Sequence, residues 1–400
     1  MKLVCFGQSK SFQAIILKRG GIQVSSSVAK ASTHIPMLDL KAQYRSIEEE
    51  IREAIDSVLE SQHFILGPQV QALEEEVARY CGARFGVGVA SGTDALLLAL
   101  HAAGVGRGDE VILPSFSFIA TADTVSLLGA VPVFVDIQPE TFNINPARIA
   151  EKITPRTRAI IAVHLYGQPA DMDPIMEIAQ ARGLMVLEDS AQAIGAKYKG
   201  RRVGSVGDLG CISFFPSKNL GGYGDGGMVV TDSEELARRL RSLRGHGSTK
   251  KYFSEEQGWN SRLDELQAAI LRAKLRHLDA WNGARRANAD SYDRFLRSIS
   301  GVIPPVRSSF GEHIFHQYTV RVQQRARVQS ELANAGIAST VYYPVPIHLQ
   351  PIYASLNYRS GDLPETEKAS GEVLSLPMYP ELNTEQIQLI AQAIGSALRG

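Results

Sequence analysis

Residues 158–189 read RAIIAVHLYGQPADMDPIMEIAQARGLMVLED. Two short apolar runs, at 158–165 and 184–189, flank a segment of helical or loop character. Apolar runs of this length, bounded by polar segments, are typical of strands that are buried on both faces of a sheet. This stretch therefore predicts a strand, a helix and a second strand in succession.

The same alternation extends along the chain in both directions. Segments of helical character, such as 93–104 and 122–129, lie between most of the apolar runs. Such alternation predicts an α/β fold with a largely parallel sheet and helices on both of its faces. The further apolar runs are FGVGVA (85–90), DEVILPS (109–115), AVPVFVDI (130–137), LGCISFF (209–215) and GGMVVTD (226–232).

The length of 400 residues exceeds what one compact core usually absorbs, so we expect two domains. Apolar residues recur at helical spacing in 41–60 and 68–82, and a long helical stretch covers 262–296. The remainder of the chain alternates in the manner of a smaller α+β unit. The predicted parts are an N-terminal extension (1–34), a large domain (35–260), a connecting helical region (261–298) and a small C-terminal domain (299–400).

The composition excludes several classes of protein. There are 42 Lys and Arg against 42 Asp and Glu, a balance that gives no broad attraction to nucleic acid or a membrane surface. No run approaches the roughly 18 apolar residues of a membrane-spanning helix. Cys5, Cys81 and Cys211 fit neither a metal site nor a disulfide framework, so we expect no metal and a cytoplasmic location.

The first 38 residues differ in composition from the rest of the chain. They carry five Lys or Arg and no acidic residue, as an organelle transit peptide does. No amphipathic pattern accompanies this composition. We therefore interpret the segment as a flexible extension.

The segment VLEDSAQAIGA (186–196) ends an apolar strand in Asp189. Ligands of open α/β sheets bind beyond the carboxyl ends of the strands, which is where Asp189 is expected to lie. Taken alone, an acidic residue at the end of a strand is better explained as the cap of a turn than as part of a site.

The segment VASGTDALLLAL (89–100) predicts a strand, a tight turn and a helix. Gly92 permits the close turn, and the N–H groups of Thr93 and Asp94 at the helix N-terminus form a cradle for phosphate. The neighbouring GVGVAS resembles a dinucleotide-binding GxGxxG motif. A dinucleotide-binding motif requires an acidic residue at the end of the strand that follows it. Glu110 instead precedes that strand, so we reject this interpretation.

Lys218 follows an apolar strand in SFFPSKNLGGYGDGG (213–227), with Ser213 five residues before it. A lysine amine can form a Schiff base with an aldehyde, especially when its surroundings lower its pKa. Pyridoxal phosphate requires such a lysine, a carboxylate for its ring nitrogen and donors for its phosphate. Phe118 is a candidate to cover the ring, although a core aromatic would have the same spacing. Together these residues predict a pyridoxal phosphate site.

Six motifs together resemble the DegT/DnrJ/EryC1/StrS family of sugar aminotransferases, in the family's order and from about Ile35 to the C-terminus. The resemblance implies fold type I, the aspartate aminotransferase-like fold, in a homodimer with shared active sites. It is strongest to enzymes that aminate C3 of nucleotide-linked 3-keto-6-deoxyhexoses. The motifs are SGTDALLLAL, PSFSFIATA, VHLYGQPADMD, EDSAQAIGA, SFFPSKNLGGYGDGG and WNSRLDELQAA.

The resemblance also implies a role for individual residues. For the cofactor, these are Lys218 as the Schiff-base lysine, Asp189 at the pyridine nitrogen, Gln192 at the ring hydroxyl, Phe118 stacked on the ring, Gly92, Thr93, Asp94 and Ser213 at the phosphate, and Asn260 at the phosphate of the partner's cofactor. For the substrate, the candidates are Tyr223, Arg262, Tyr343 and His348. His164 is expected to support the floor of the site, and a helix-capping role is the alternative for Asn260.

The implied reaction moves the amino group of L-glutamate to C3 of a dTDP-3-keto-6-deoxyhexose. The products are a dTDP-3-amino-3,6-dideoxyhexose, for polysaccharide or O-antigen biosynthesis, and 2-oxoglutarate. Amination at C4, or of a UDP-linked 3-keto uronic acid, is an alternative. Related sugar dehydratases carry histidine at the lysine position, so Lys218 argues against that activity. A regulatory protein on the same scaffold would show a damaged cofactor site or a basic DNA-binding segment.

Overall fold

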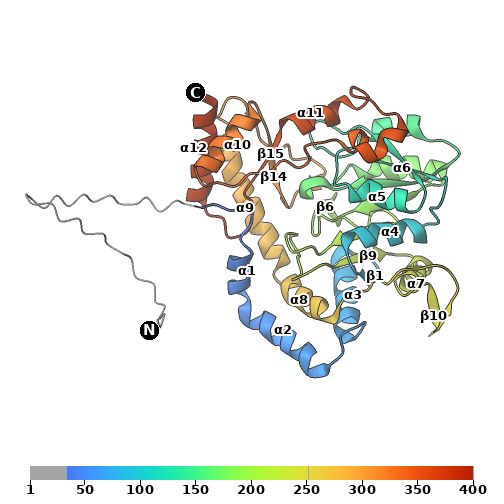
Figure 1. Ribbon diagram of the computed structural model, residues 1–400. Coiled ribbons are helices and arrows are strands. Elements are labelled where there is room, and N and C mark those ends of the chain that lie inside the picture. The colour runs from blue at the N-terminus through green and yellow to red at the C-terminus, as the bar shows by residue number, and fades with distance from the viewer. Residues whose placement is uncertain (1–33, 251, 400) are drawn as a thin grey trace, which may run out of the picture. The chain divides into compact units, whose positions relative to one another are not determined.

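The computed structural model describes residues 34–250 and 252–399 (Figure 1). The prediction for the N-terminal extension therefore falls, apart from His34, outside the described residues. None of the helices in the described part of the chain has the length and apolar character needed to cross a membrane. The division into domains at 260 and 298 stays a prediction.

A seven-stranded sheet forms the centre of the fold, in the order β1-β9-β8-β5-β4-β2-β3. Strand β9 runs antiparallel to both of its neighbours, and the other neighbouring pairs are parallel. The largely parallel α/β sheet predicted from the sequence is thus confirmed. The strands are β1 (Phe85–Val89), β2 (Glu110–Pro114), β3 (Val131–Val135), β4 (Thr157–Val163), β5 (Met185–Asp189), β8 (Leu209–Ser213) and β9 (Gly227–Thr231).

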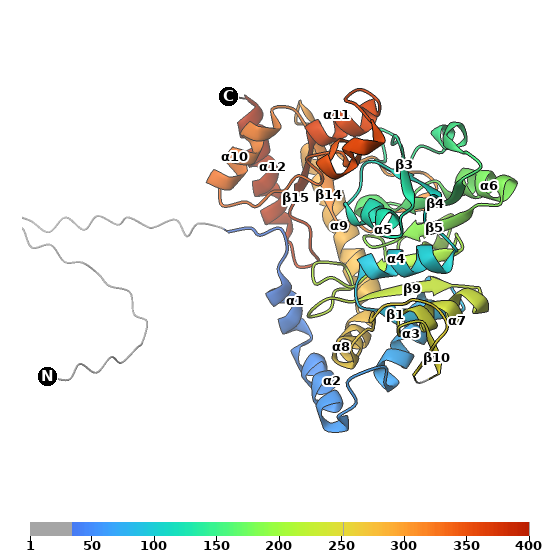
Figure 2. The same cartoon turned by 45° about the vertical axis from the view of Figure 1, so that its right-hand side comes forward.

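Helices cover both faces of this sheet (Figure 2). One face packs against α4 (Gly92–Ala102), α5 (Ala120–Leu127) and α7 (Glu234–Leu243). The opposite face packs against α6 (Met172–Arg182), α3 (Pro68–Cys81) and α8 (Glu265–Leu275).

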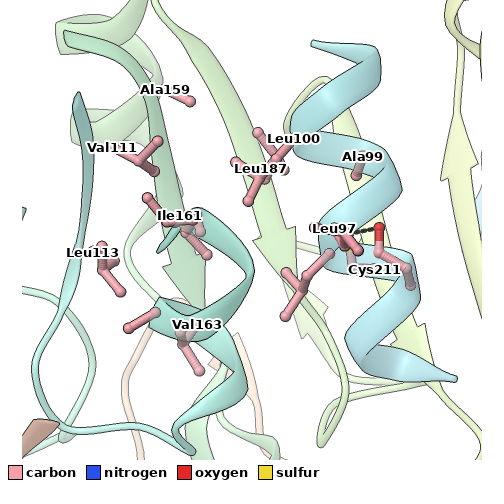
Figure 3. Packing of buried hydrophobic residues seen from close by; sticks show 14 of the residues in the cluster. Leu97, Ala99, Leu100, Val111, Leu113, Ala159, Ile161, Val163, Leu187 and Cys211 are labelled. Carbon is pink, nitrogen blue, oxygen red and sulfur yellow. Dashed lines mark hydrogen bonds between the residues drawn. The ribbon is translucent and has the colours of Figure 1, made fainter. Parts of the chain in front are cut away.

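Strand β4 shows why residues 159–163 are all apolar. Ala159, Ile161 and Val163 face the core that contains α4 and α5, whereas Ile160 and Ala162 face the core that contains α6 (Figure 3). Successive side chains of a strand point to opposite faces, so a strand covered on both sides has no polar positions.

The C-terminal part contains a three-stranded antiparallel sheet in the order β12-β14-β15. Its core is shared with three helices, α9, α10 and α12. The elements are β12 (Val302–Ile303), β14 (Tyr318–Val322), β15 (Val373–Leu376), α9 (Leu278–Leu296), α10 (Arg325–Asn334), α11 (Pro364–Glu372), α12 (Thr384–Arg399), η4 (Ile347–Leu349) and η5 (Pro351–Leu356).

The remaining elements are short or peripheral. A third sheet pairs β13 (Gly311–Glu312), β6 (Lys197–Tyr198) and β7 (Arg201–Arg202), and a hairpin joins β10 (Ser248–Lys250) to β11 (Phe253–Ser254). The others are α1 (Leu40–Ser46), α2 (Glu48–Ser61), η1 (Pro146–Arg148), η2 (Ala150–Lys152) and η3 (Leu165–Gly167).

Two predicted helices are interrupted in the structure. The expected helix at 41–60 is divided at Ile47 between α1 and α2. The long stretch at 262–296 is divided between α8 and α9, at Arg276 and His277. Apolar periodicity identifies the buried face of a helix but says little about breaks of one or two residues.

Candidate functional site

A cavity of about 390 Å³ lies at the carboxyl ends of the central strands. Asp189 ends β5 and Ser213 ends β8, and these two strands pair in parallel. The turn that begins α4 and the loop that follows β8 complete this side of the cavity. The topology therefore places the predicted residues at the edge of the sheet where ligands of α/β folds bind.

Most of the predicted cofactor residues line this one cavity. They are Gly92, Thr93, Phe118, Asp189, Gln192, Ser213 and Lys218, and the predicted substrate residue Tyr343 joins them. They come from five separate stretches of the chain between residues 92 and 343, so their meeting depends on the tertiary fold.

The first turn of α4 offers hydrogen-bond donors to the cavity. Ser91 caps the helix by accepting the N–H of Asp94 at 3.0 Å, and the N–H groups of Gly92 and Thr93 precede the helical hydrogen bonds. A Cβ atom on Gly92 would lie 2.5 Å from Cβ of Ser213. Only glycine lets this turn approach β8 so closely, so the backbone donors and the Ser213 hydroxyl can bind the same anion.

Asp189 is buried at the floor of the cavity. Its Oδ2 accepts a hydrogen bond from the Thr121 hydroxyl at 3.0 Å, and its Oδ1 accepts one from Ala191 N–H at 3.2 Å. Burial raises the pKa of Asp189, and these hydrogen bonds and the charge of Lys218 oppose that rise. A cation placed against this carboxylate would stabilise its charged form.

Lys218 lies in the same cavity, five residues beyond Ser213. Burial lowers the pKa of its ammonium group to about 8, and the charge of Asp189 opposes this change. A lysine with this pKa carries a sizeable neutral fraction near neutral pH, and the neutral amine is the nucleophile.

These groups fit pyridoxal phosphate part by part. The turn of α4 and Ser213 suit its phosphate, Asp189 its ring nitrogen, and Lys218 its aldehyde. Phe118 is 55% exposed at the cavity, with its ring centroid 6.1 Å from that of Tyr343, so an aromatic face is available to a flat ring.

Gln192 also faces the cavity, held in a defined orientation. Its Oε1 accepts the backbone N–H of Tyr166 at 2.7 Å, and its Nε2 donates to the Tyr343 hydroxyl at 3.1 Å. Because a backbone N–H can only donate, the amide nitrogen of Gln192 is the atom that points away from Tyr166.

Five predicted site residues do not line the cavity. Asp94 accepts a hydrogen bond from the Ser261 hydroxyl at 2.7 Å. Asn260, which directly precedes Ser261, is exposed. Arg262 is partly buried. Tyr223 is 41% exposed, and the Lys274 Nζ atom lies 4.8 Å from the centroid of its ring.

The fifth of these residues, His348, is buried away from the cavity. Its Nδ1 lies 2.7 Å from the Ser115 hydroxyl and its Nε2 lies 3.3 Å from Glu367. His164 is also buried, and its Nε2 lies 2.9 Å from Oε2 of Glu188. Glu188 directly precedes Asp189 in the sequence.

Several cavity residues were missed by the sequence interpretation. Thr121 and Ser117 lie within the quoted motif PSFSFIATA, but their helical spacing does not distinguish them from core residues. Tyr342 directly precedes the predicted Tyr343, whereas His316 and Gln317 come from a stretch where no motif marked them.

Comparison with known proteins agrees with the family resemblance seen in the sequence. The model of the DegT/DnrJ/EryC1/StrS aminotransferase family matches residues 45–395. A pleiotropic regulatory protein of Geobacillus stearothermophilus is 52% identical over 368 residues, which are 92% of this chain and 99% of the relative.

Two further relatives carry enzyme names. The UDP-N-acetyl-3-dehydro-alpha-D-glucosamine 3-aminotransferase of Acidithiobacillus ferrooxidans is 51% identical over 92% of this chain and 99% of its own length. The dTDP-3-amino-3,4,6-trideoxy-alpha-D-glucose transaminase of Streptomyces venezuelae is 47% identical over 90% of this chain and 95% of its own length.

Among solved structures, S. venezuelae DesV in complex with a ketimine intermediate superposes with a TM-score of 0.89. It is 46% identical and covers 91% of this chain and 98% of its own. The fold predicted from the sequence is therefore that of a solved relative.

Proposed function

Because the chain belongs to the DegT/DnrJ/EryC1/StrS aminotransferase family, we propose that it aminates C3 of a nucleotide-linked 3-keto sugar with L-glutamate as donor. The protein is a pyridoxal-phosphate-dependent sugar aminotransferase. The observation that carries this conclusion is the meeting of Lys218, Asp189 and the α4 N-terminus in one cavity.

The choice of sugar carbon rests on the relatives' names. The A. ferrooxidans relative is named as a 3-aminotransferase of a UDP-linked 3-dehydro sugar, and the S. venezuelae relative as a transaminase of a dTDP-3-amino sugar. Both names support C3 over C4, but they divide between UDP and dTDP. We keep a dTDP-3-keto-6-deoxyhexose as the proposed substrate and a UDP-linked 3-keto uronic acid as the alternative.

In the proposed mechanism, bound pyridoxal phosphate supplies an electron sink and the carbon that carries the amino group between substrates. Asp189 would hold the ring nitrogen of the cofactor, and its negative charge would favour the protonated form of that nitrogen. Lys218 would hold the aldehyde carbon of the cofactor, and its free Nζ amine would act as the base that accepts the proton of the substrate carbon and as the acid that releases it. Positioned acid–base groups of this kind give about 10² to 10⁴ in rate.

A non-enzymatic role has one point in its favour, the regulatory name of the G. stearothermophilus relative. A regulatory protein on this scaffold would tolerate damage to the cofactor site. Lys218 and Asp189 are both present and face one cavity, which supports catalysis instead.

A homodimer with shared active sites is part of the proposal. Asn260 and Arg262 do not line the cavity of their own chain, and large apolar side chains such as Phe64 and Ile65 are exposed. If Asn260 serves the partner's cofactor, mixing inactive Lys218→Ala and Asn260→Ala subunits will restore activity, because each hybrid dimer then contains one complete site. Mixtures that stay inactive would place Asn260 outside the partner's site.

A cytoplasmic location is also proposed, because the three cysteines match no disulfide framework. His348 and Tyr223 stay predictions as substrate contacts.

The function is tested by offering L-glutamate with dTDP- and UDP-linked 3-keto and 4-keto sugars and locating the new amine by NMR. We expect amination at C3 of a dTDP-linked 3-keto-6-deoxyhexose. Amination at C4, or of the UDP-linked uronic acid, would establish an alternative. No turnover of any nucleotide sugar by a cofactor-loaded protein would contradict the proposed function.

A further inference from the structure

His316 lies at the wall of the catalytic cavity, two residues before the first residue of β14. Its side chain is largely buried, and its Nδ1 lies 3.1 Å from Oδ1 of Asn219, the residue that follows Lys218. The backbone of His316 is held from behind, because the guanidinium of Arg285 donates to its carbonyl at 3.4 Å and to that of Phe315 at 3.3 Å.

Asn219 belongs to a chain of buried hydrogen bonds that ends at a backbone carbonyl. Its Nδ2 donates to Oδ1 of Asn282 at 2.8 Å, and Nδ2 of Asn282 donates to the carbonyl of Ile194 at 3.2 Å. Gly195 permits the last contact, because a Cβ atom there would lie 2.6 Å from Nδ2 of Asn282.

The Ile194 carbonyl determines which atom donates in each hydrogen bond of this series. A carbonyl can only accept, so the Asn282 atom that faces it must be the amide nitrogen. The Asn282 oxygen then faces Asn219, whose nitrogen must donate to it, and the Asn219 oxygen faces His316. The proton of the imidazole is therefore on Nδ1, and Nε2 carries a lone pair.

The environment keeps this ring neutral. Burial, together with the positive charges of Lys218 and Arg285, holds the pKa of His316 well below its ordinary value. Within the part of the chain that the structure describes, no group is hydrogen-bonded to Nε2, and His316 lines the cavity.

An acceptor without a donor at the cavity wall indicates a ligand that brings a donor. A keto-sugar carries hydroxyl groups close to its carbonyl. Glutamate, once its amine has reacted, offers only carboxylates, which are acceptors. The sugar is therefore the substrate that matches this wall.

We propose that Asn282 and Asn219 fix His316 as the Nδ1–H tautomer, so that its Nε2 accepts a hydrogen bond from a hydroxyl group of the nucleotide-linked sugar. Asn219 and Asn282 are positioning residues, since they act through His316. The assignment of the sugar rests on the proposed function, whereas the assignment of the tautomer does not.

The tautomer is measured by ¹⁵N NMR of the holoenzyme labelled in its histidines, with His316 identified by comparison with His316→Gln. We expect a protonated Nδ1 and an unprotonated Nε2 at pH 7. Asn282→Ala removes the hydrogen bond between Asn282 and Asn219 without altering a residue of the cavity. It should convert His316 to an average of both tautomers.

Asn288→Ala is the matched control for this variant. Asn288 lies on the same helix, α9, and its Nδ2 donates to the Tyr379 carbonyl at 2.9 Å, outside the chain that reaches His316. Its loss should leave the His316 signals unchanged. A protonated Nε2 in the unaltered protein, or the same spectrum in Asn282→Ala, would overturn the tautomer assignment.

The ligand is tested in the two half-reactions, followed separately by the absorbance of the cofactor. His316→Phe should raise the half-saturating concentration of the sugar about tenfold and change that of glutamate less than about threefold. His316→Gln keeps an acceptor near the position of Nε2 and should recover most of the sugar affinity.

Equal effects on both half-reactions would overturn the sugar assignment while leaving the NMR result intact. A protein that converts glutamate but no nucleotide sugar would contradict the proposed function instead, and with it the sugar assignment. In that case the tautomer is still decided by the NMR experiment.

Discussion

The hydroxyl of Thr121 donates a 3.0 Å hydrogen bond to Oδ2 of Asp189. Ser117 Oγ lies 2.8 Å from Thr121 Oγ1, and because the Thr121 proton is used on Asp189, Ser117 is the donor of this second bond. Two hydroxyl groups from the start of α5 thus support the charge of a carboxylate at the end of β5.

Replacing Thr121 with valine should lower kcat about tenfold. A hydrogen bond to a charged group contributes about 1.5–3 kcal/mol, and its loss raises the pKa of Asp189 and weakens its hold on the ring proton. Steady-state kinetics with saturating substrates measure this change. Thr124→Val is the control, because Thr124 is equally buried on α5 but donates to the Ala120 carbonyl. An unchanged kcat in Thr121→Val would remove Thr121 from the support of Asp189.

Cofactor uptake by the apoprotein should accelerate with pH and level off above about pH 8. Burial lowers the pKa of Lys218 to about 8, and only the neutral amine attacks an aldehyde. Stopped-flow absorbance between pH 6.5 and 9.5 measures the rate. Borohydride reduction and mass spectrometry should then locate the adduct on Lys218. Lys274 is the internal control, because its pKa is also about 8 but it does not line the cavity. An adduct there, or a midpoint near pH 10.5, would be incompatible with the proposed role of Lys218.

Gly92→Ala should weaken cofactor binding at least tenfold and destabilise the fold by about 1–3 kcal/mol. The new methyl group would meet Cβ of Ser213 at 2.5 Å and its hydroxyl at 2.9 Å, which separates the two sides of the phosphate cradle. Equilibrium titration with pyridoxal phosphate and urea denaturation measure the two effects. Gly106→Ala is the control, because a Cβ atom at Gly106 meets nothing within 4 Å. Equal cofactor affinities in the two variants would show that the close approach of α4 to β8 is dispensable.

The protein should lose stability between pH 7 and pH 5, in part through His313. This ring is buried, its Nδ1 accepts the N–H of Phe315 at 2.9 Å, and burial lowers its pKa to about 3. The unfolded chain binds a proton near pH 6.5 and the folded chain does not, so stability rises with pH between about 3 and 6.5. At pH 5 the cost for His313 is about 2 kcal/mol relative to neutral pH.

Urea denaturation at the two pH values measures this difference. His313→Asn keeps an acceptor for the Phe315 N–H but does not titrate, so the loss between pH 7 and pH 5 should be smaller by about that amount. An identical loss in the variant would show that other groups account for the acid sensitivity.

The sequence by itself determined the order of the elements and much of the cavity. Strand β4 was recognised because both of its faces are apolar, and the turn at Gly92 because a strand, a glycine and a helix follow one another closely. Asp189 was located because it ends an apolar run and Lys218 because it follows one, whereas Ser213 lies within a run and received its role from the family resemblance. Signals of this kind are local, since the period of a strand or helix and the residues at its end are written in consecutive positions.

Only the tertiary structure decided which distant side chains face these residues. Thr121 reaches Asp189 across 68 positions, and His316 reaches Asn219 across 97. His348, which was predicted to contact the substrate, is instead buried against Ser115 across 233 positions. The orientation of a side chain toward a cavity or toward the core depends on the packing of whole helices and strands against each other. Periodicity within one segment carries no information about the partner that another segment will bring to it.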